Sequence, residues 1–199
     1  MPALSRNDLW SLEEYAARRA AFRAEVIAHK KQRQLALGAN ARLYFEDELT
    51  IRYQVQEMLR IERLFEAEAI EEELAAYNPL IPDGSNWKAT FMLEFPDPAE
   101  RQERLSQMLG IEDRVWLQVQ DCERIYAIAD EDLERANAVK TSSVHFLRFE
   151  LTPTMVQAVQ HGADIAAGID HAAYPVDEVR LPAQVRNSLA ADLGPVSIN

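Results

Sequence analysis

The first third of the chain places its hydrophobic residues at the spacing of α-helices. Residues 5–34 carry apolar side chains three, four and seven positions apart, so we expect one helix that ends before Gly38. Residues 54–77 repeat this spacing and predict a second long helix with an apolar stripe. Residues 42–46 alternate between apolar and polar side chains and predict a strand, while 49–53 fits either a short strand or the start of the second helix.

Beyond residue 78 the pattern changes from helical to alternating. Two prolines and a glycine within 78–84 predict a rigid, non-helical connector. The period of two that follows predicts three strands and one hairpin: 88–95, 143–151, 163–169, and 115–119 with 124–129. Short helices are expected over 97–109 and 153–160, and a short polar helix or loop over 130–139.

Helices that precede a mostly antiparallel sheet define an α+β fold, with the N-terminal helices packed on the sheet. We expect a single α+β domain over residues 1–175. Residues 176–199 are expected to form a C-terminal tail, in which 182–193 is either a final helix or mobile.

Composition narrows the classes of function. The chain has 199 residues with 21 Lys and Arg against 33 Asp and Glu, a net charge of −12 that argues against nucleic-acid binding. Cys122 is the only cysteine, which excludes an internal disulfide and a cysteine-rich metal site. No apolar leader and no run of about 18 apolar residues is present, so we expect a cytoplasmic protein without a membrane partner.

The negative total hides an uneven distribution of charge, because cations gather in the first helix and anions follow Glu62. The predicted ligand-binding surface joins the basic end of the first helix to the polar face of the second. Its residues are His29, Lys30, Lys31, Arg52, Gln56 and Arg60. Arginine donates a fixed fork of N–H groups to carboxylate or phosphate, so this surface suits a small anionic ligand or an acidic partner. The simpler interpretation is a solvated face with cations at a helix C-terminus.

An enzyme acting on a small anionic substrate is a second hypothesis. The arginines would hold the anion while Glu57, Tyr53 or His145 acts as acid or base. The chain contains no G-x-S-x-G, no P-loop and no G-x-G-x-x-G motif, so esterase, nucleotide hydrolase and dinucleotide-binding functions have no support.

A metal-binding protein is the third hypothesis, with His145, Glu150, Asp170 and His171 as candidate ligands. No ligand spacing supports it, because no two histidines lie four positions apart. His145 shares its strand face with Leu147 and Phe149. It is therefore more typical of a hydrogen-bonded core histidine.

Several long motifs resemble a bacterial family known only as a domain of unknown function. They include RYQVQEMLRIER at 52–63, AYNPLIPDG at 76–84 and TSSVHFLRFEL at 141–151, and the resemblance extends from about Leu4 to Tyr174. No catalytic residue can be carried over from this family, and the resemblance does not specify a cofactor. It does imply a setting beside rubrerythrin and an iron–sulfur oxidoreductase, so we expect a binding or accessory protein of an oxidative-stress or electron-transfer system. A redox-protein partner is the corresponding expectation.

Overall fold

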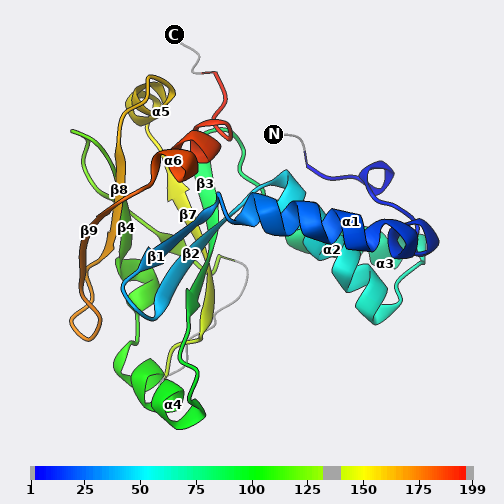
Figure 1. The fold of residues 1–199 in the computed structure, drawn as a ribbon, viewed down its shortest axis with the longest axis horizontal. Coiled ribbons are helices and arrows are strands. Elements are labelled where there is room, and N and C mark those ends of the chain that lie inside the picture. The colour runs from blue at the N-terminus through cyan, green and yellow to red at the C-terminus, as the bar shows by residue number, and fades with distance from the viewer. Residues whose placement is uncertain (1–2, 132–139, 196–199) are drawn as a thin grey trace.

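Six α-helices and two antiparallel sheets make up the part of the chain that the computed structural model describes, residues 3–131 and 140–195 (Figure 1). The predicted α+β class is confirmed. The α-helices are α1 Leu12–Lys30, α2 Glu48–Glu62, α3 Ala67–Tyr77, α4 Pro98–Gln107, α5 Pro153–Gln160 and α6 Ala183–Ala190. Three short 3₁₀ helices are η1 Arg6–Asp8, η2 Asn78–Leu80 and η3 Ile111–Arg114. The strands are β1 Gln34–Leu37, β2 Ala41–Glu46, β3 Asn86–Leu93, β4 Val115–Val119, β5 Ile125–Tyr126, β6 Ile128–Ala129, β7 Val144–Glu150, β8 Ile165–Ile169 and β9 Val176–Arg180.

The two sheets form the body of the protein. One has the strand order β1-β2-β3-β7-β6 and the other β5-β4-β8-β9. Alternate side chains of both sheets enter one shared core, to which Trp87, Phe91 and Phe149 contribute from the first sheet and Leu117 and Ile165 from the second. The opposite face of the five-stranded sheet carries the other half of each alternating pattern and is largely polar.

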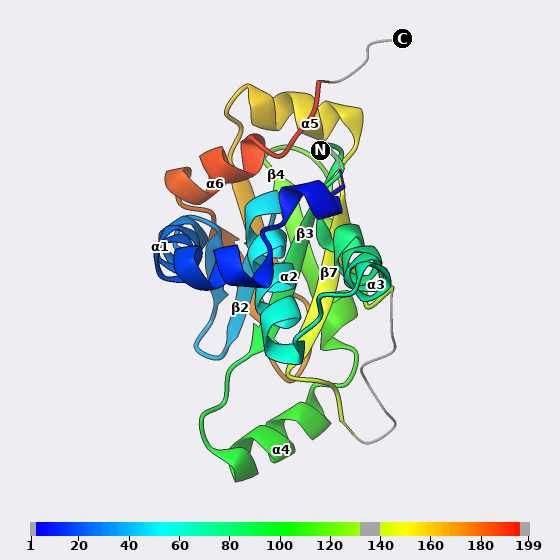
Figure 2. The same ribbon diagram turned by 90° about the vertical axis from the view of Figure 1, so that its right-hand side faces the viewer.

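Helices α1, α2 and α3 form an arm that projects from the body, with α2 between the other two (Figures 1 and 2). The arm has small cores of its own. Val55 and Leu74 belong to the one between α2 and α3, while Tyr15, Phe22 and Val26 of α1 form another. The arm is therefore held together separately from the core between the sheets.

Both long helices are shorter than the pattern predicts. The first ends at Lys30, because the residues that follow form strand β1, which buries Leu35 and Leu37 in the core. Gly38 (φ +76°) then forms the turn into β2. The predicted helix over 54–77 is broken at Arg63, which adopts the left-handed conformation and separates α2 from α3. Phe65, expected in the apolar stripe, is 67 % exposed in this break.

The alternative that 49–53 begins a helix is confirmed. The side chain of Asp47 accepts from the backbone N–H of Thr50, and the Thr50 hydroxyl accepts from the backbone N–H of Asp47. This reciprocal cap satisfies backbone donors that would otherwise lack partners. Helix α2 therefore begins at Glu48.

The other sequence predictions are largely confirmed, with small shifts at the ends of elements. The hairpin over 124–129 is only half correct. Strand β5 pairs with β4 as expected, but β6 pairs with β7 in the other sheet, so this segment passes between the sheets. The expectation for 130–139 falls mostly on residues 132–139, which lie outside the described residues.

The C-terminal segment belongs to the body rather than to a tail. Strand β9 pairs with β8, and α6 occupies the expected range of a final helix. Val185 and Leu189 of α6 are buried in the main core, and the indole N–H of Trp87 donates to the Leu189 carbonyl at 3.0 Å. Residues 176–195 therefore complete the two-sheet body.

Arg33 joins the arm to the body. Its side chain is 2 % exposed and donates to the backbone carbonyls of Phe45 and Glu46 at the end of β2, each at 3.1 Å. It also donates to both carboxylate oxygens of Asp192, beyond α6, and lies 3.3 Å from the Asp47 carboxylate that caps α2. One guanidinium thus ties β2, α2 and the segment after α6 together.

Two carboxylates share this guanidinium, and His29 bonds to the same Asp47. Burial raises the pKa of Asp192 to about 6, although the adjacent Arg33 acts in the opposite direction. Because this folded-state pKa lies above the ordinary value of 3.8, the contribution of Asp192 to stability is greatest below pH 3.8. It decreases as the pH rises through 6.

We expect Arg33→Met to lower the free energy of unfolding by about 3–5 kcal/mol near neutral pH, because two buried carboxylates lose the guanidinium that they share. Arg180→Met is the matched control, since Arg180 is 74 % exposed and pairs with Glu178 at the surface. The control should change stability by at most about 1 kcal/mol. Urea unfolding followed by circular dichroism measures both, and equal losses would contradict the role of Arg33.

Candidate functional site

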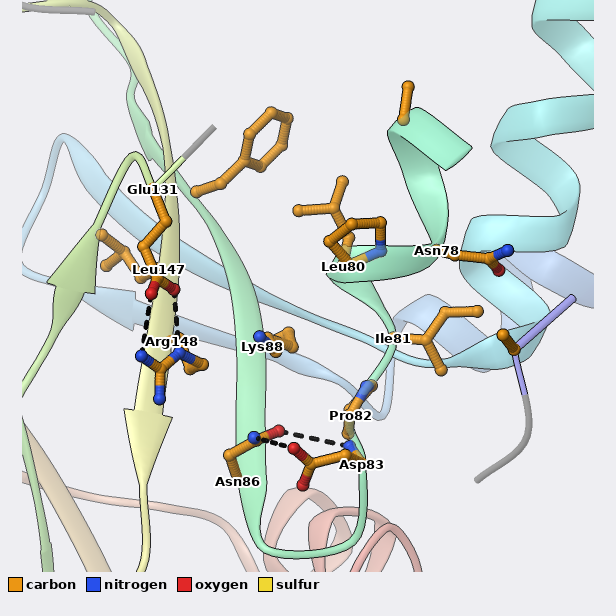
Figure 3. A pocket seen from close by; sticks show the side chains of 14 residues that line it. Asn78, Leu80, Ile81, Pro82, Asp83, Asn86, Lys88, Glu131, Leu147 and Arg148 are labelled. Carbon is orange, nitrogen blue, oxygen red and sulfur yellow. Dashed lines mark hydrogen bonds and ion pairs between the residues drawn. The ribbon is translucent and has the colours of Figure 1, made fainter. Parts of the chain in front are cut away.

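A pocket of about 640 Å³ lies between the end of the arm and the polar face of the five-stranded sheet (Figure 3). One wall is the connector from η2 into β3. The opposite wall comes from β3 and β7. The apolar part of the lining comes from Pro79, Leu80, Ile81, Pro82 and Phe146. Its volume is in the range of sites for small molecules.

The connector wall is fixed by proline and by side-chain hydrogen bonds. Asn78 donates to the Leu4 carbonyl and accepts from the Leu4 backbone N–H, which holds the N-terminal segment beside the pocket. Asp83 accepts from Ser85 and Asn86, closing a tight turn at the base of β3. Gly84 in this turn has a φ of +103°, and its carbonyl accepts from the Gly194 backbone N–H. The wall is therefore attached to both ends of the described chain.

Lys88 is the central polar residue of the pocket. It lies on β3, between Arg148 of β7 and the connector residues Ile81 and Pro82 (Figure 3). Its side chain is partly buried, and no hydrogen bond or ion pair joins it to any of the described residues. Burial lowers the pKa of Lys88, and the nearby positive charge of Arg148 lowers it further, while Glu131, Asp83 and Glu150 act in the opposite direction without reversing the shift.

Arg148 is, by contrast, fully engaged. Its Nε and Nη2 donate to the two carboxylate oxygens of Glu131, each at 2.8 Å (Figure 3). Its Nη1 donates to Glu150. This arrangement holds the pKa of Glu131 below its usual range. Because two carboxylates already occupy the donors of Arg148, Lys88 is the cation that is available to a ligand among the described residues of the pocket lining.

The side chains of the predicted anion-binding surface do not converge on one site. Gln56 is fully buried and exchanges hydrogen bonds with the backbone of Trp10, with its Oε1 2.7 Å from the Trp10 nitrogen. The Arg52 guanidinium lies over the rings of Trp10 and Phe22, while Arg60 is exposed. Gln56 and Arg52 thus fix the segment before α1 rather than offering donors to a ligand.

The basic end of α1 is partly engaged as well. The His29 ring nitrogen Nε2 lies 2.5 Å from the Asp47 carboxylate. Lys31 is exposed and Lys30 is partly exposed at the end of the helix, where their charges complement the helix dipole.

The candidate acid–base residues lie outside the pocket. Glu57 accepts from Tyr15 at 2.5 Å and from two nitrogens of Arg19, each at 2.7 Å, so it links α2 to α1. These bonds lower the pKa of Glu57 to about 2, with Arg19 as the main cause. Tyr53 packs edge-on against Phe22 in the arm. Neither residue lines the pocket.

His145 is a hydrogen-bonded core histidine, as its strand face predicts. Its side chain is fully buried, Nδ1 lies 2.6 Å from an Asp130 oxygen, and Nε2 lies 2.9 Å from the Thr141 hydroxyl. Glu112 also contacts this group, with an oxygen 3.1 Å from the Thr141 hydroxyl. This polar network and the pocket lie on opposite faces of the five-stranded sheet.

The proposed metal ligands are not brought together. His145 and Glu150 point to opposite faces of β7, and Asp170 accepts from Trp116, Arg124 and Tyr126 beside the other sheet. His171 bonds to the Leu109 carbonyl. Over residues 3–131 and 140–195, no three His, Cys, Asp or Glu side chains are grouped in a way that could hold a metal ion.

Sequence reasoning missed Lys88, Arg148, Glu131 and Asp83. In the sequence, Lys88 is only a polar position in an alternating strand. Its special setting comes from the register, which places Lys88 directly opposite Arg148 on the neighbouring strand. Like charges at such positions are unfavourable, so a sequence-based signal would require knowledge of which strands pair.

The fold and this site define an α+β protein in which a helical arm and a two-sheet body enclose a pocket with a lysine in its wall. Residues 3–193 match the family described as protein of unknown function (DUF3501), and the chain belongs to this family. The match continues beyond Tyr174, where the motifs recognised in the sequence end. None of the helices in the described part of the chain has both the length and the apolar character that crossing a bilayer demands.

A solved structure is similar over nearly the whole chain. It is the 1.90 Å crystal structure of a novel protein of unknown function from Burkholderia pseudomallei K96243. The two sequences are 51 % identical, with a TM-score of 0.93, and the alignment covers 97 % of this chain and 100 % of that one. No curated protein matches the chain.

Glu57→Gln should lower the free energy of unfolding by about 1–3 kcal/mol above pH 4.5, because Arg19 loses its charged acceptor. The folded-state pKa of Glu57 is about 2, below its ordinary 4.5, so this contribution is present above pH 4.5 and is lost as the pH falls toward 2. Urea unfolding at several pH values measures the difference. Glu62→Gln, at an exposed position of the same helix, is the control, and a loss independent of pH would contradict the assignment.

Proposed function

We propose that the protein binds a small, largely apolar carboxylate in the pocket between the arm and the five-stranded sheet. The observation that carries this proposal is Lys88, a partly buried amine that has no hydrogen-bonding or ionic partner among the described residues. Removing an ammonium group from water without pairing it is costly. A ligand carboxylate would offset that cost with a charge-assisted hydrogen bond.

The walls of the pocket indicate the rest of the ligand. Leu80, Ile81 and Phe146 offer apolar surface on the two sides of Lys88. Because the donors of Arg148 are bonded to Glu131 and Glu150, the described part of the pocket lining offers one cationic anchor rather than a cluster. A monoanion with an apolar body suits it better than a polyanion such as a nucleotide.

The small anionic ligand expected from the sequence thus moves from the α2 surface to this pocket. An accessory role in an oxidative-stress or electron-transfer system, a cytoplasmic location and a redox-protein partner stay predictions. The exposed cations of α1 and of its C-cap, Arg23 and Lys31 among them, are the surface on which an acidic protein partner would dock.

Binding of 2-naphthoate and of its neutral analogue 2-naphthamide tests the proposal. The acid should bind the wild-type protein roughly 10–100-fold more tightly than the amide, because a hydrogen bond to a charged group contributes about 1.5–3 kcal/mol. In Lys88→Met this preference should disappear. Isothermal titration calorimetry measures all four dissociation constants.

Lys31→Met is the matched control, because Lys31 is exposed and does not line the pocket. This variant should keep the preference of the wild-type protein for the acid. Lys88→Arg keeps the positive charge and should keep most of the preference. If Lys88→Met still favours the acid to the same extent, or if the wild-type protein binds neither compound, the proposal fails.

A further inference from the structure

We propose that Lys88 is also a nucleophile, which forms an imine with a small aldehyde bound in the same pocket. This inference rests on the proposed function only in that it uses the same cavity. It assigns a covalent chemistry to the amine and an aldehyde with an apolar body as the class of substrate.

The register of the sheet sets up this chemistry. Lys88 of β3 lies directly opposite Arg148 of β7, so an ammonium group at Lys88 faces a permanent positive charge. On its other side, Lys88 lies opposite Glu46 of β2. Glu46 directs one carboxylate oxygen to the Thr90 hydroxyl at 2.7 Å rather than to the lysine.

Lys88 therefore has a repulsive neighbour and no bonded counter-ion among the described residues, within a partly apolar cavity. The carboxylates of Glu131, Asp83 and Glu150 lie nearby and raise its pKa, but their combined effect is smaller than that of burial and Arg148. Burial and Arg148 both lower its pKa, in that order, which increases the fraction of neutral amine near neutral pH. Desolvation in a hydrophobic pocket and proximity to a second cation are two means by which a lysine becomes nucleophilic. Lys88 combines both.

Arg148 could not replace Lys88 in this role, because a guanidinium keeps its proton at every physiological pH. Its three donor nitrogens are in any case bonded to Glu131 and Glu150. Its part is to place a fixed positive charge beside the amine.

The proposed step is balanced without an oxidant, a reductant or a cofactor. The Lys88 nitrogen forms a bond to the aldehyde carbon and gives a carbinolamine. The carbon–oxygen bond then breaks, and the oxygen leaves as water with the two hydrogens of the neutral amine. The product is an imine between Lys88 and the substrate carbon, and hydrolysis reverses the step.

The chain is well suited to a test, because only four lysines are present: Lys30, Lys31, Lys88 and Lys140. Wild-type protein is incubated near neutral pH with 2-naphthaldehyde and sodium cyanoborohydride, which reduces any imine to a stable secondary amine. Peptide mass spectrometry then locates and quantifies the naphthylmethyl group at each lysine. We expect Lys88 to be modified at least about tenfold faster than Lys31, because it offers a larger fraction of neutral amine and the cavity binds the aldehyde beside it.

Variants separate this inference from the proposed function. Lys88→Arg should lose the adduct yet keep binding 2-naphthoate, whereas Lys88→Met should lose both. Excess 2-naphthoate should slow modification of Lys88 without affecting Lys31. Modification of Lys88 no faster than that of Lys31 in folded wild-type protein would overturn the inference, even if 2-naphthoate binds.

Discussion

The buried guanidinium of Arg33 is the interaction on which the arrangement of this protein depends. In place of water, it contacts the carbonyls at the end of β2 and the Asp47 carboxylate that caps α2. It also bonds to the carboxylate of Asp192, which lies 159 residues away in sequence. The helical arm and the two-sheet body have separate apolar cores, so hydrophobic burial alone does not fix one against the other. A buried charge that needs acceptors from several elements supplies a defined geometry, since a misplaced element leaves it unsatisfied.

The pocket is a consequence of that geometry. One of its walls is the chain that leaves the arm, and the other is the polar face of the body's larger sheet. The turn at Asp83 and the hydrogen bond between Gly84 and Gly194 fix the connector wall where it enters β3. The cavity between them contains Lys88, which faces Arg148 within the sheet. Each of these features is structural in itself, but together they leave one amine available to a ligand.

Local patterns predicted the elements, because alternation and helical spacing depend on neighbours in sequence. The strand face that includes Leu147 and Phe149 also identified His145 correctly as a core residue. The break of the second helix at Arg63 and the transfer of β6 to the other sheet were not predictable, since both depend on tertiary packing. The α2 face resembled an anion site because Gln56 and Arg52 have suitable chemistry, yet the Trp10 segment occupies them. The site at Lys88 needs the pairing of β3 with β7, which no local pattern encodes.

NMR of protein labelled with ¹³C at the lysine ε-carbon tests the central claim most directly, because the chain has four lysines. Lys88→Arg assigns the resonance of Lys88. The account predicts that this resonance titrates at a lower pH than the ordinary value for a lysine side chain and that 2-naphthoate shifts it alone. A Lys88 resonance that titrates at the ordinary value for lysine and is unaffected by 2-naphthoate would contradict the claim that Lys88 is the ligand-binding group of the pocket.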